Sequence, residues 1–168
     1  MVIIKYKINM KTTIILLILA TATFSLAAQT VSEKTVNGTT YVITDNRFGK
    51  EIKNKNGFDK YIKETFCPVY IKNCGTTSKD LVRKIFSEER IKELASISDA
   101  NMPILLICSL SGDVVAVKFI RVNTDVITWE EIKALEDAYL QLKFEFDTSK
   151  CTDAKYCLIN YPINFSKL

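Results

Sequence analysis

Five cysteines are the side chains in this sequence best suited to covalent chemistry. They are Cys67, Cys74, Cys108, Cys151 and Cys157. The spacings from Cys67 to Cys74 and from Cys151 to Cys157 are too wide for a Cys-x-x-Cys redox centre or a zinc knuckle. In an oxidising compartment they suit two local disulfides, each worth about 2 to 3 kcal/mol. Cys108 lies inside an apolar run, so we predict that it is a buried free thiol.

The chain has no histidine. Catalytic units built on Ser-His-Asp or Cys-His, and zinc sites with histidine ligands, are therefore excluded. Paired carboxylates remain, because a glycosidase needs two acids roughly 5 to 10 Å apart. The available pairs, Glu88-Glu89 and Glu130-Glu131, each fall in the first turn of an expected helix, where an acid stabilises the helix dipole. We predict no catalytic, metal or cofactor-binding residue, and keep an acid-pair glycan hydrolase as an alternative.

A basic segment between residues 47 and 63 is the one notable cluster of charge, with Glu51 and Asp59 as its only acids. It is a candidate interaction loop for an anionic surface, although a flexible, solvated loop in a nearly neutral protein is the favoured explanation. No aromatic residue alternates with the bases before Phe58, so we expect no nucleic-acid partner. The candidate residues are Arg47, Lys50, Lys53, Lys55, Lys60 and Lys63.

The first 28 residues have the organisation of an export signal. Three lysines without any acid precede an apolar run at 14–20, and small residues end the segment at 25–28. This order predicts a signal peptide over residues 1–28, cleaved to give a secreted or periplasmic chain of residues 29–168. The run is shorter than the roughly 20 residues of a membrane-spanning helix. No cysteine follows the cleavage site, so we do not expect a lipoprotein. We expect contact with the membrane only through the leader. Met1 and Met10 are both candidate starts.

Charge and size bound the mature chain. The leader contains three of the 23 basic residues and none of the 19 acidic ones, which leaves a net charge of +1. About 140 residues form one domain that buries roughly two thirds of the surface of its unfolded chain.

Turn and capping signals divide that domain into elements. Asn37-Gly38 predicts a type I′ hairpin between strands at 32–36 and 39–44, followed by a mobile polar loop at 45–57. Apolar spacing predicts helical segments at 58–66 and 77–95. Thr128 and Glu131 form a capping box that begins the clearest helix. The only tryptophan, Trp129, is either a sugar-stacking platform or an edge of the core, and we favour the core.

Strands are predicted at 104–110, 114–122 and 156–165, the last limited by Pro162. We expect an α+β fold in which these three strands, with few or no others, form an antiparallel sheet packed by two or more helices. Residues 29–86 would add a hairpin, a loop and a helical extension.

Residues 87–168 resemble the C-terminal domain of the TonB family. The resemblance is carried by the strand at 104–110, the turn Ser111-Gly112-Asp113-Val114-Val115, the helix opening Thr128-Trp129-Glu130-Glu131 and the closing Tyr161-Pro162-Ile163-Asn164-Phe165. It implies a three-stranded sheet with two helices that binds proteins through a sheet edge, and it transfers no catalytic residue. A cleavable leader replaces the retained TonB anchor, and the Pro-rich spacer is missing, so energy transduction is not implied.

These features together predict a non-catalytic exported binding or adaptor protein. It would recognise a protein or cell-envelope component by β-edge pairing or through the basic segment. A small secreted inhibitor held by the two short disulfide loops is a further alternative. The sequence does not determine the oligomeric state.

Overall fold

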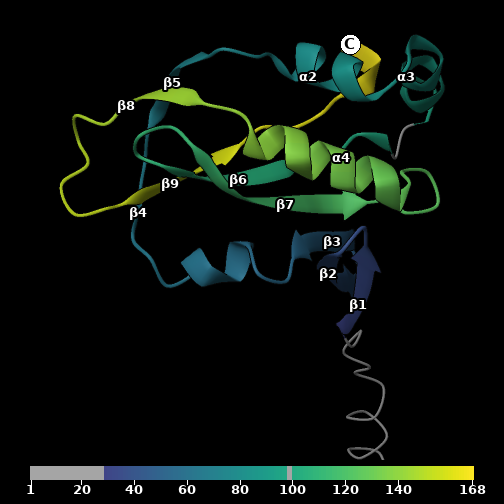
Figure 1. The fold of residues 1–168 in the computed structure, drawn as a ribbon, viewed down its shortest axis with the longest axis horizontal. Helices are drawn as coiled ribbons and strands as arrows, with labels where there is room; N and C mark the ends of the chain where they lie inside the picture. The colour runs from purple at the N-terminus through teal and green to yellow at the C-terminus, as the bar shows by residue number, and fades with distance from the viewer. Residues whose placement is uncertain (1–28, 98–99) are drawn as a thin grey trace, which may run out of the picture.

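The computed structural model describes residues 29–97 and 100–168 of the chain. The predicted leader lies outside the described residues. Within them, no helix is long and apolar enough to cross a membrane. Over these described residues the fold is α+β, with one mixed sheet, a second two-stranded sheet and three α-helices (Figure 1).

The main sheet has seven strands in the order β1-β2-β3-β7-β6-β9-β4. Strands β1 (Thr30–Val36), β2 (Thr39–Asn46) and β3 (Gly49–Asn54) form an antiparallel meander, and β3 pairs with β7 (Val114–Val122). Next comes β6 (Ile104–Ser109), antiparallel to β7, and then β9 (Tyr156–Asn160), antiparallel to β6. The last strand is β4 (Phe66–Cys67), which is parallel to β9. Strands β5 (Tyr70–Cys74) and β8 (Phe144–Asp147) form the small sheet.

Helix α4 (Trp129–Leu140) covers one face of the main sheet, where its buried stripe of Ile132, Leu135 and Tyr139 joins the core. Thr128 and Glu131 make the predicted capping box at its start. Helices α2 (Ser78–Ile85) and α3 (Glu88–Ala95), with the 3-10 turn η3 (Phe165–Lys167), lie beyond it (Figure 1). The long segment predicted at 77–95 is thus two helices, because Phe86 is extended and Ser87 caps the second.

The opposite face of the sheet carries a smaller core beneath the 3-10 turn η1 (Phe58–Tyr61). Phe58 packs there with Ile107 of β6, whereas Leu106 of β6 lies in the larger core on the α4 side. The interpretation of 104–110 as a central strand covered on both faces is therefore confirmed.

Several expectations are corrected. The sheet is mixed and has more strands than the three-stranded core predicted, although strands 104–110, 114–122 and 156–160 do form its antiparallel centre. The loop expected at 45–57 contains β3, which joins the N-terminal hairpin to β7. Ile52 is the only fully buried residue of β3, so the strand has no apolar alternation to reveal it. The helix expected at 58–66 shortens to η1, and the last strand stops at Asn160 before Pro162.

Candidate functional site

The two edges of the main sheet differ in how they are protected. Edge strand β4 has two residues and is tied down by a disulfide between Cys67 and Cys151. Edge strand β1 has seven residues, of which the first six are exposed. Its pairing with β2 runs from Thr30 to Val36 without a bulge, and it contains no proline. A long, regular edge strand is a template for pairing with another chain.

The turn that precedes β2 determines which backbone groups of β1 are free. Asn37 and Gly38 both have positive φ, 46° and 79°, as a type I′ turn requires. Such a turn makes Val36 and Thr39 a hydrogen-bonded pair, and hydrogen-bonded pairs then alternate along the ladder. The carbonyl of Thr40 accepts from Lys55 on the β3 side, in agreement with this alternation. The backbone N–H and C=O groups of Val31, Glu33 and Thr35 therefore point away from the sheet.

Side chains hold this hairpin against the body of the protein. Tyr41 of β2 is fully buried, and its hydroxyl donates a 2.6 Å hydrogen bond to the carboxylate of Glu136 on α4. Burial and this carboxylate raise the pKa of Tyr41 well above its usual range, so the hydroxyl remains a donor. The ammonium of Lys34 lies 5.3 Å from the ring centroid of Trp129, and Lys55 forms a 2.8 Å ion pair with Glu33. The free edge is thus presented on a fixed strand.

Trp129 is half-buried and packs against the core, with its ring centroid 6.1 Å from that of Tyr41. Its indole contacts Tyr41 and Lys34, so it links the helix to the hairpin. This placement confirms the interpretation that Trp129 closes an edge of the core.

The basic residues predicted as an interaction loop are divided among different surroundings. Lys50 donates to Thr124, Lys53 pairs with Asp59 at 2.6 Å, and Lys55 pairs with Glu33. The Arg47 guanidinium lies 4.5 Å from the ring centroid of Phe48, while Lys60 and Lys63 are exposed. Successive side chains of strand β3 point to opposite faces of the sheet, and several of the charges are paired. These six residues therefore do not form one basic surface.

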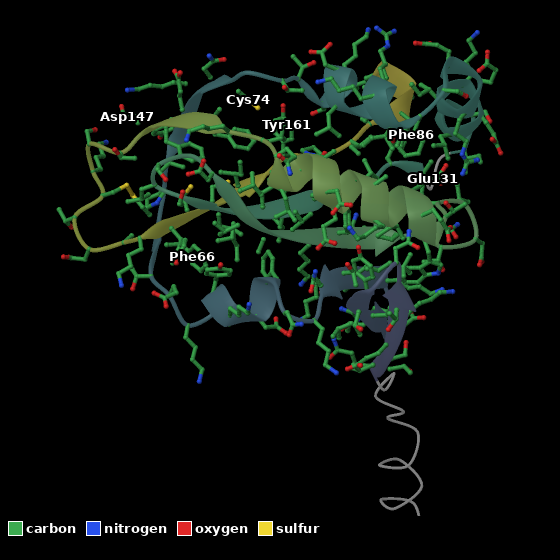
Figure 2. All side chains as sticks on the ribbon, in the orientation of Figure 1. Phe66, Cys74, Phe86, Glu131, Asp147 and Tyr161 are labelled. Carbon is green, nitrogen blue, oxygen red and sulfur yellow. A yellow bond between two sulfur atoms is a disulfide. The ribbon has the colours of Figure 1, made fainter. Side chains whose placement is uncertain are left out.

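One glutamate of each acid pair has a structural partner. The Glu131 carboxylate accepts from Arg90 at 2.8 Å and from the Thr128 backbone N–H at 2.8 Å, at the N-terminal end of α4 (Figure 2). Burial alone would raise the pKa of Glu131, but the hydrogen bonds from Arg90 and Thr128 hold it below its usual value. Glu88 lies 3.2 Å from Arg83, and Glu89 and Glu130 are exposed.

The predicted disulfide pairing is wrong. Cys67 bonds to Cys151, 84 residues away, with 5.6 Å between their Cα atoms. Residues 67–74 run through β4 and β5 as nearly extended chain, which separates Cys67 and Cys74 by about 20 Å, far beyond disulfide reach. The Cys157 side chain points from β9 into the core of the protein. Cys151 lies in the β8–β9 loop and reaches the edge strand β4 instead. Among the described residues the free thiols are Cys74, Cys108 and Cys157.

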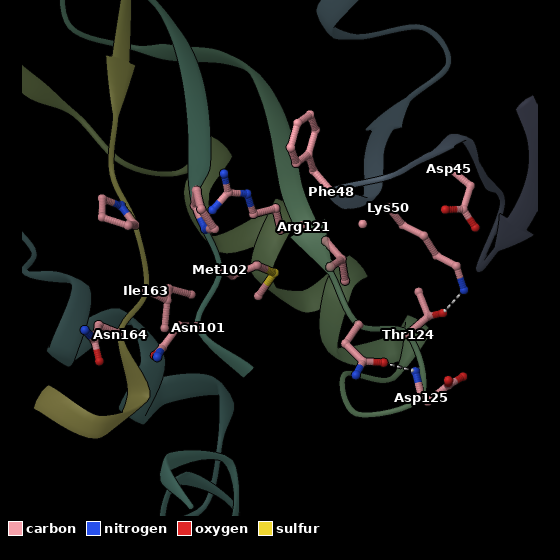
Figure 3. A pocket seen from close by; sticks show the side chains of 15 residues that line it. Asp45, Phe48, Lys50, Asn101, Met102, Arg121, Thr124, Asp125, Ile163 and Asn164 are labelled. Carbon is pink, nitrogen blue, oxygen red and sulfur yellow. Dashed lines mark hydrogen bonds between the residues drawn. The ribbon is translucent and has the colours of Figure 1, made fainter. Parts of the chain in front are cut away.

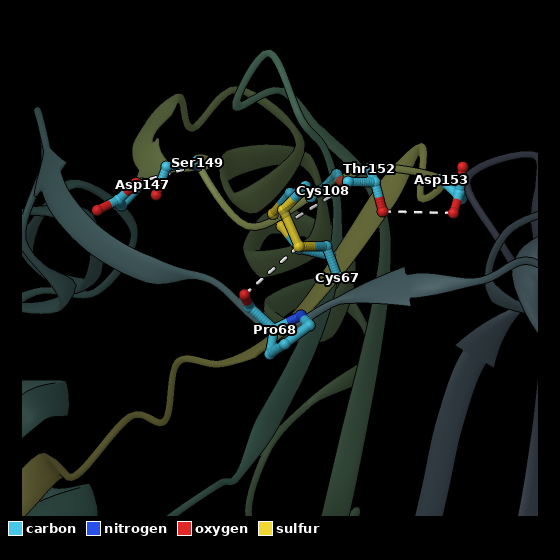
Figure 4. The surroundings of a disulfide bond; sticks show 9 residues. Cys67, Pro68, Cys108, Asp147, Ser149, Thr152 and Asp153 are labelled. Atoms are coloured by element: carbon cyan, nitrogen blue, oxygen red, sulfur yellow. Dashed lines mark hydrogen bonds between the residues drawn. A yellow bond between two sulfur atoms is a disulfide. The ribbon is translucent and has the colours of Figure 1, made fainter.

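Three cysteines occupy one row across adjacent strands. Cys157 of β9 is in register with Cys67 of β4 on one side and with Cys108 of β6 on the other, next to the disulfide (Figure 4). The prediction that Cys108 is a buried free thiol is confirmed. Its hydrogen bond with Cys157 and its burial raise the pKa of Cys108 above the usual thiol range, so this thiol is protonated and unreactive at neutral pH. Across residues 29–97 and 100–168, no group of three or more potential ligands could hold a metal ion.

Comparisons with known proteins identify no family for this chain. No protein-family model matches the sequence, and no curated protein does. Among solved structures, the chain is similar to the crystal structure of a DUF5043 family protein from Bacteroides uniformis ATCC 8492. The TM-score is 0.54 at 15% identity, over 80% of this chain and 85% of that one. At that identity the likeness shows a shared α+β fold and nothing about activity.

Proposed function

We propose that this chain is a non-catalytic exported binding protein that recognises another protein by β-strand addition. An extended segment of the partner would pair with the free edge of β1, with main-chain hydrogen bonds supplying affinity and alternate side chains supplying specificity. The observation that carries the proposal is that edge strand β1 is seven residues long and exposed over its first six residues. The strand at the other edge of the same sheet, β4, is short and is held by a disulfide. Export rests on the leader predicted at residues 1–28.

The charges of β1 favour a different chain over a second copy. Two copies pairing antiparallel through their outward-facing groups, with nearly the whole strand in register, would place Glu33 opposite Glu33. The two shifted registers that keep the outward-facing groups paired each overlap only five residues of β1, and one of them places Lys34 opposite Lys34 while the other places Ser32 opposite Ser32. Like charges directly opposite one another are destabilising. A partner segment with a base opposite Glu33 and an acid opposite Lys34 avoids both conflicts.

The resemblance of residues 87–168 to the TonB C-terminal domain supports a binding role of the same kind. In this chain the three strands that carry the resemblance have neighbours on both sides, since β3 flanks β7 and β4 flanks β9. We therefore assign strand addition to β1, which lies at the edge of the sheet. No specific observation favours a hydrolase or an inhibitor, so we do not propose either.

A proline at position 31 tests the proposal, because it removes an outward-facing N–H without removing a bond to β2. A photo-crosslinking amino acid is placed at Thr35, and adducts formed in the native envelope or medium are compared between the parent, Val31→Pro and Val31→Thr. We expect a discrete protein adduct that falls by at least about tenfold in Val31→Pro and persists in Val31→Thr, which keeps the N–H. Circular dichroism verifies that both variants are folded.

Three results would overturn the proposal. These are undiminished adducts in the folded Val31→Pro variant, adducts only with a second copy of this chain, or adducts only with lipid or glycan. Equal loss in both variants would also overturn it, because contact would then depend on the valine side chain and not on strand pairing.

A further inference from the structure

A pocket of about 700 Å³ lies at one end of the main sheet (Figure 3). It is bounded by the β2–β3 turn, the end of β7 with its following loop, the segment before β6 and the segment after β9. Its volume falls in the range of small-molecule sites. Met102 and Ile163 border the pocket, and their backbones are joined by two hydrogen bonds of 3.0 Å, while their side chains are almost fully buried in the core. This part of the wall is thus held in place by the core.

A β-bulge aims an arginine at this pocket. Lys50 is in register with Val122 and Ile52 with Phe119, so β7 places two residues opposite one of β3. One of the two, Arg121, has φ of 56°, a left-handed conformation that non-glycine residues rarely adopt. Gly49 allows the turn to lie against this bulge, because a Cβ on Gly49 would come within 3.2 Å of the Arg121 Cα. Bulges of this kind redirect side chains next to functional sites.

The guanidinium of Arg121 has no ion pair or hydrogen bond with any part of the chain that the structure describes, although charged neighbours elsewhere on this sheet are paired. Phe48 lies beside it in Figure 3 and is 62% exposed. One end of the pocket therefore offers an unneutralised, bidentate cation next to an open aromatic ring.

The asparagines of the pocket present donors. The Oδ1 atom of Asn101 accepts from the Phe165 N–H, and that of Asn123 accepts from the Asp125 N–H, both at 3.0 Å. Backbone N–H groups can only donate, so these bonds fix each amide with its NH₂ group free. Asn164, whose Oδ1 accepts from Ser166 at 2.7 Å, lies next to Asn101 in Figure 3. The free groups therefore suit a ligand rich in acceptor oxygens.

Two carboxylates also line the pocket, and their position limits where an anion can bind. Asp45 and Asp125 lie on the side of Lys50 and Thr124, away from Asn101 and Asn164 (Figure 3). An anionic group is therefore received at Arg121, while a hydroxyl donor can meet the two aspartates.

We propose that this pocket binds an acidic sugar, a hexuronate unit of a glycan. Its carboxylate would pair with the Arg121 guanidinium, and its ring oxygens and hydroxyls would accept from the asparagine amides. The apolar C–H face of the sugar would lie against the exposed ring of Phe48. The site is separate from the β1 edge and does not depend on that proposal.

Chemical-shift titration of the purified protein with D-glucuronate, D-glucose and inorganic phosphate at about 0.15 M salt tests the proposal. We expect glucuronate to shift the amides of Arg121 and Asn123 and to saturate with a Kd on the order of 1 mM. Glucose should bind at least about tenfold more weakly, because it lacks the carboxylate. Phosphate should also bind more weakly, because it lacks the apolar face.

Arg121→Gln and Lys63→Gln form a matched pair of variants. Both remove one exposed positive charge, but only Arg121 lines the pocket. Arg121→Gln should weaken glucuronate binding by at least about tenfold, and Lys63→Gln by less than about twofold. Absence of saturable glucuronate binding, equal loss in both variants, or phosphate binding as tight as glucuronate would each overturn the assignment. The β1 crosslink described above should be unchanged by Arg121→Gln, so the two proposals can fail independently.

Discussion

Removing the disulfide between Cys67 and Cys151 should be the most costly covalent change available in this chain. The bond closes a loop with a sequence separation of 84 residues. In the chain-entropy estimate a loop of that length restricts the unfolded state by about 4.5 kcal/mol at 25 °C. Either of the two local pairings suggested by spacing alone would contribute only about half as much. The size of the loss therefore reports which cysteines are joined.

The double variant Cys67→Ser/Cys151→Ser is preferred to single changes. Cys157 is in register with Cys67, so a chain lacking only Cys151 could form a substitute bond. Urea unfolding, followed by the fluorescence of Trp129, should give a midpoint about 2 M lower for the double variant than for the oxidised parent. The parent protein with its disulfide reduced is the control, and its urea midpoint should equal that of the double variant.

Two outcomes would refute this reasoning. One is a loss of less than about 1 kcal/mol in the double variant, which a disulfide closing so long a loop cannot give unless the unfolded state is already restricted. The other is a peptide map of the oxidised protein that joins Cys67 to Cys74.

Three further measurements test other parts of the structure. Alkylation of the denatured protein without reductant should label three thiols, and in the native state Cys74 should react well before the buried Cys108 and Cys157; labelling of only one thiol would contradict the assigned pairing. Gly112→Ala should lower the free energy of unfolding by at least about 2 kcal/mol, because Gly112 has φ of 96° and the new Cβ would lie 1.8 Å from the Phe144 carbonyl oxygen. The control is Gly75→Ala, whose Cβ would meet open space. In the same thermal unfolding assay it should stay within about 0.5 kcal/mol of the parent. Glu131→Gln should cost about 1 kcal/mol at pH 7. Because the folded state lowers the pKa of Glu131, this stabilisation is present above the ordinary glutamate pKa of about 4.3 and is lost as pH falls through the lower folded value; a difference between parent and variant that persists unchanged at pH 2 would refute the ion-pair account.

Local signals in the sequence were sufficient for the elements whose chemistry is local. The Asn37-Gly38 turn, the Thr128–Glu131 capping box and the apolar strand at 104–110 all form as predicted. Each depends on residues close together in the chain, so its pattern is visible without knowledge of the fold.

Elements that depend on distant partners could not be predicted in the same way. Strand β3 has one fully buried residue, and β4 is only two residues long, so neither produces a periodic pattern. Cys151 lies close to Cys67 in the fold where β4 pairs with β9, although the two cysteines are 84 residues apart in the chain. The pocket is assembled from segments far apart in the chain, and the Arg121 conformation arises from a register shift against β3. Of the predicted interaction residues, only Lys50 contributes to that pocket.

The long span of the Cys67–Cys151 bond has a consequence for biogenesis. During synthesis or translocation Cys67 and Cys74 emerge together, while Cys151 follows only after most of the chain. If the nascent chain meets an oxidant, Cys74 is the first thiol within reach of Cys67, and the loop between them is short while the segment is not yet extended as β4 and β5. The native bond would then arise by thiol–disulfide exchange, with Cys151 attacking the earlier bond and releasing Cys74. In that case maturation would include disulfide isomerisation as well as oxidation, with Cys74 as the thiol that is released and left unpaired in the folded chain.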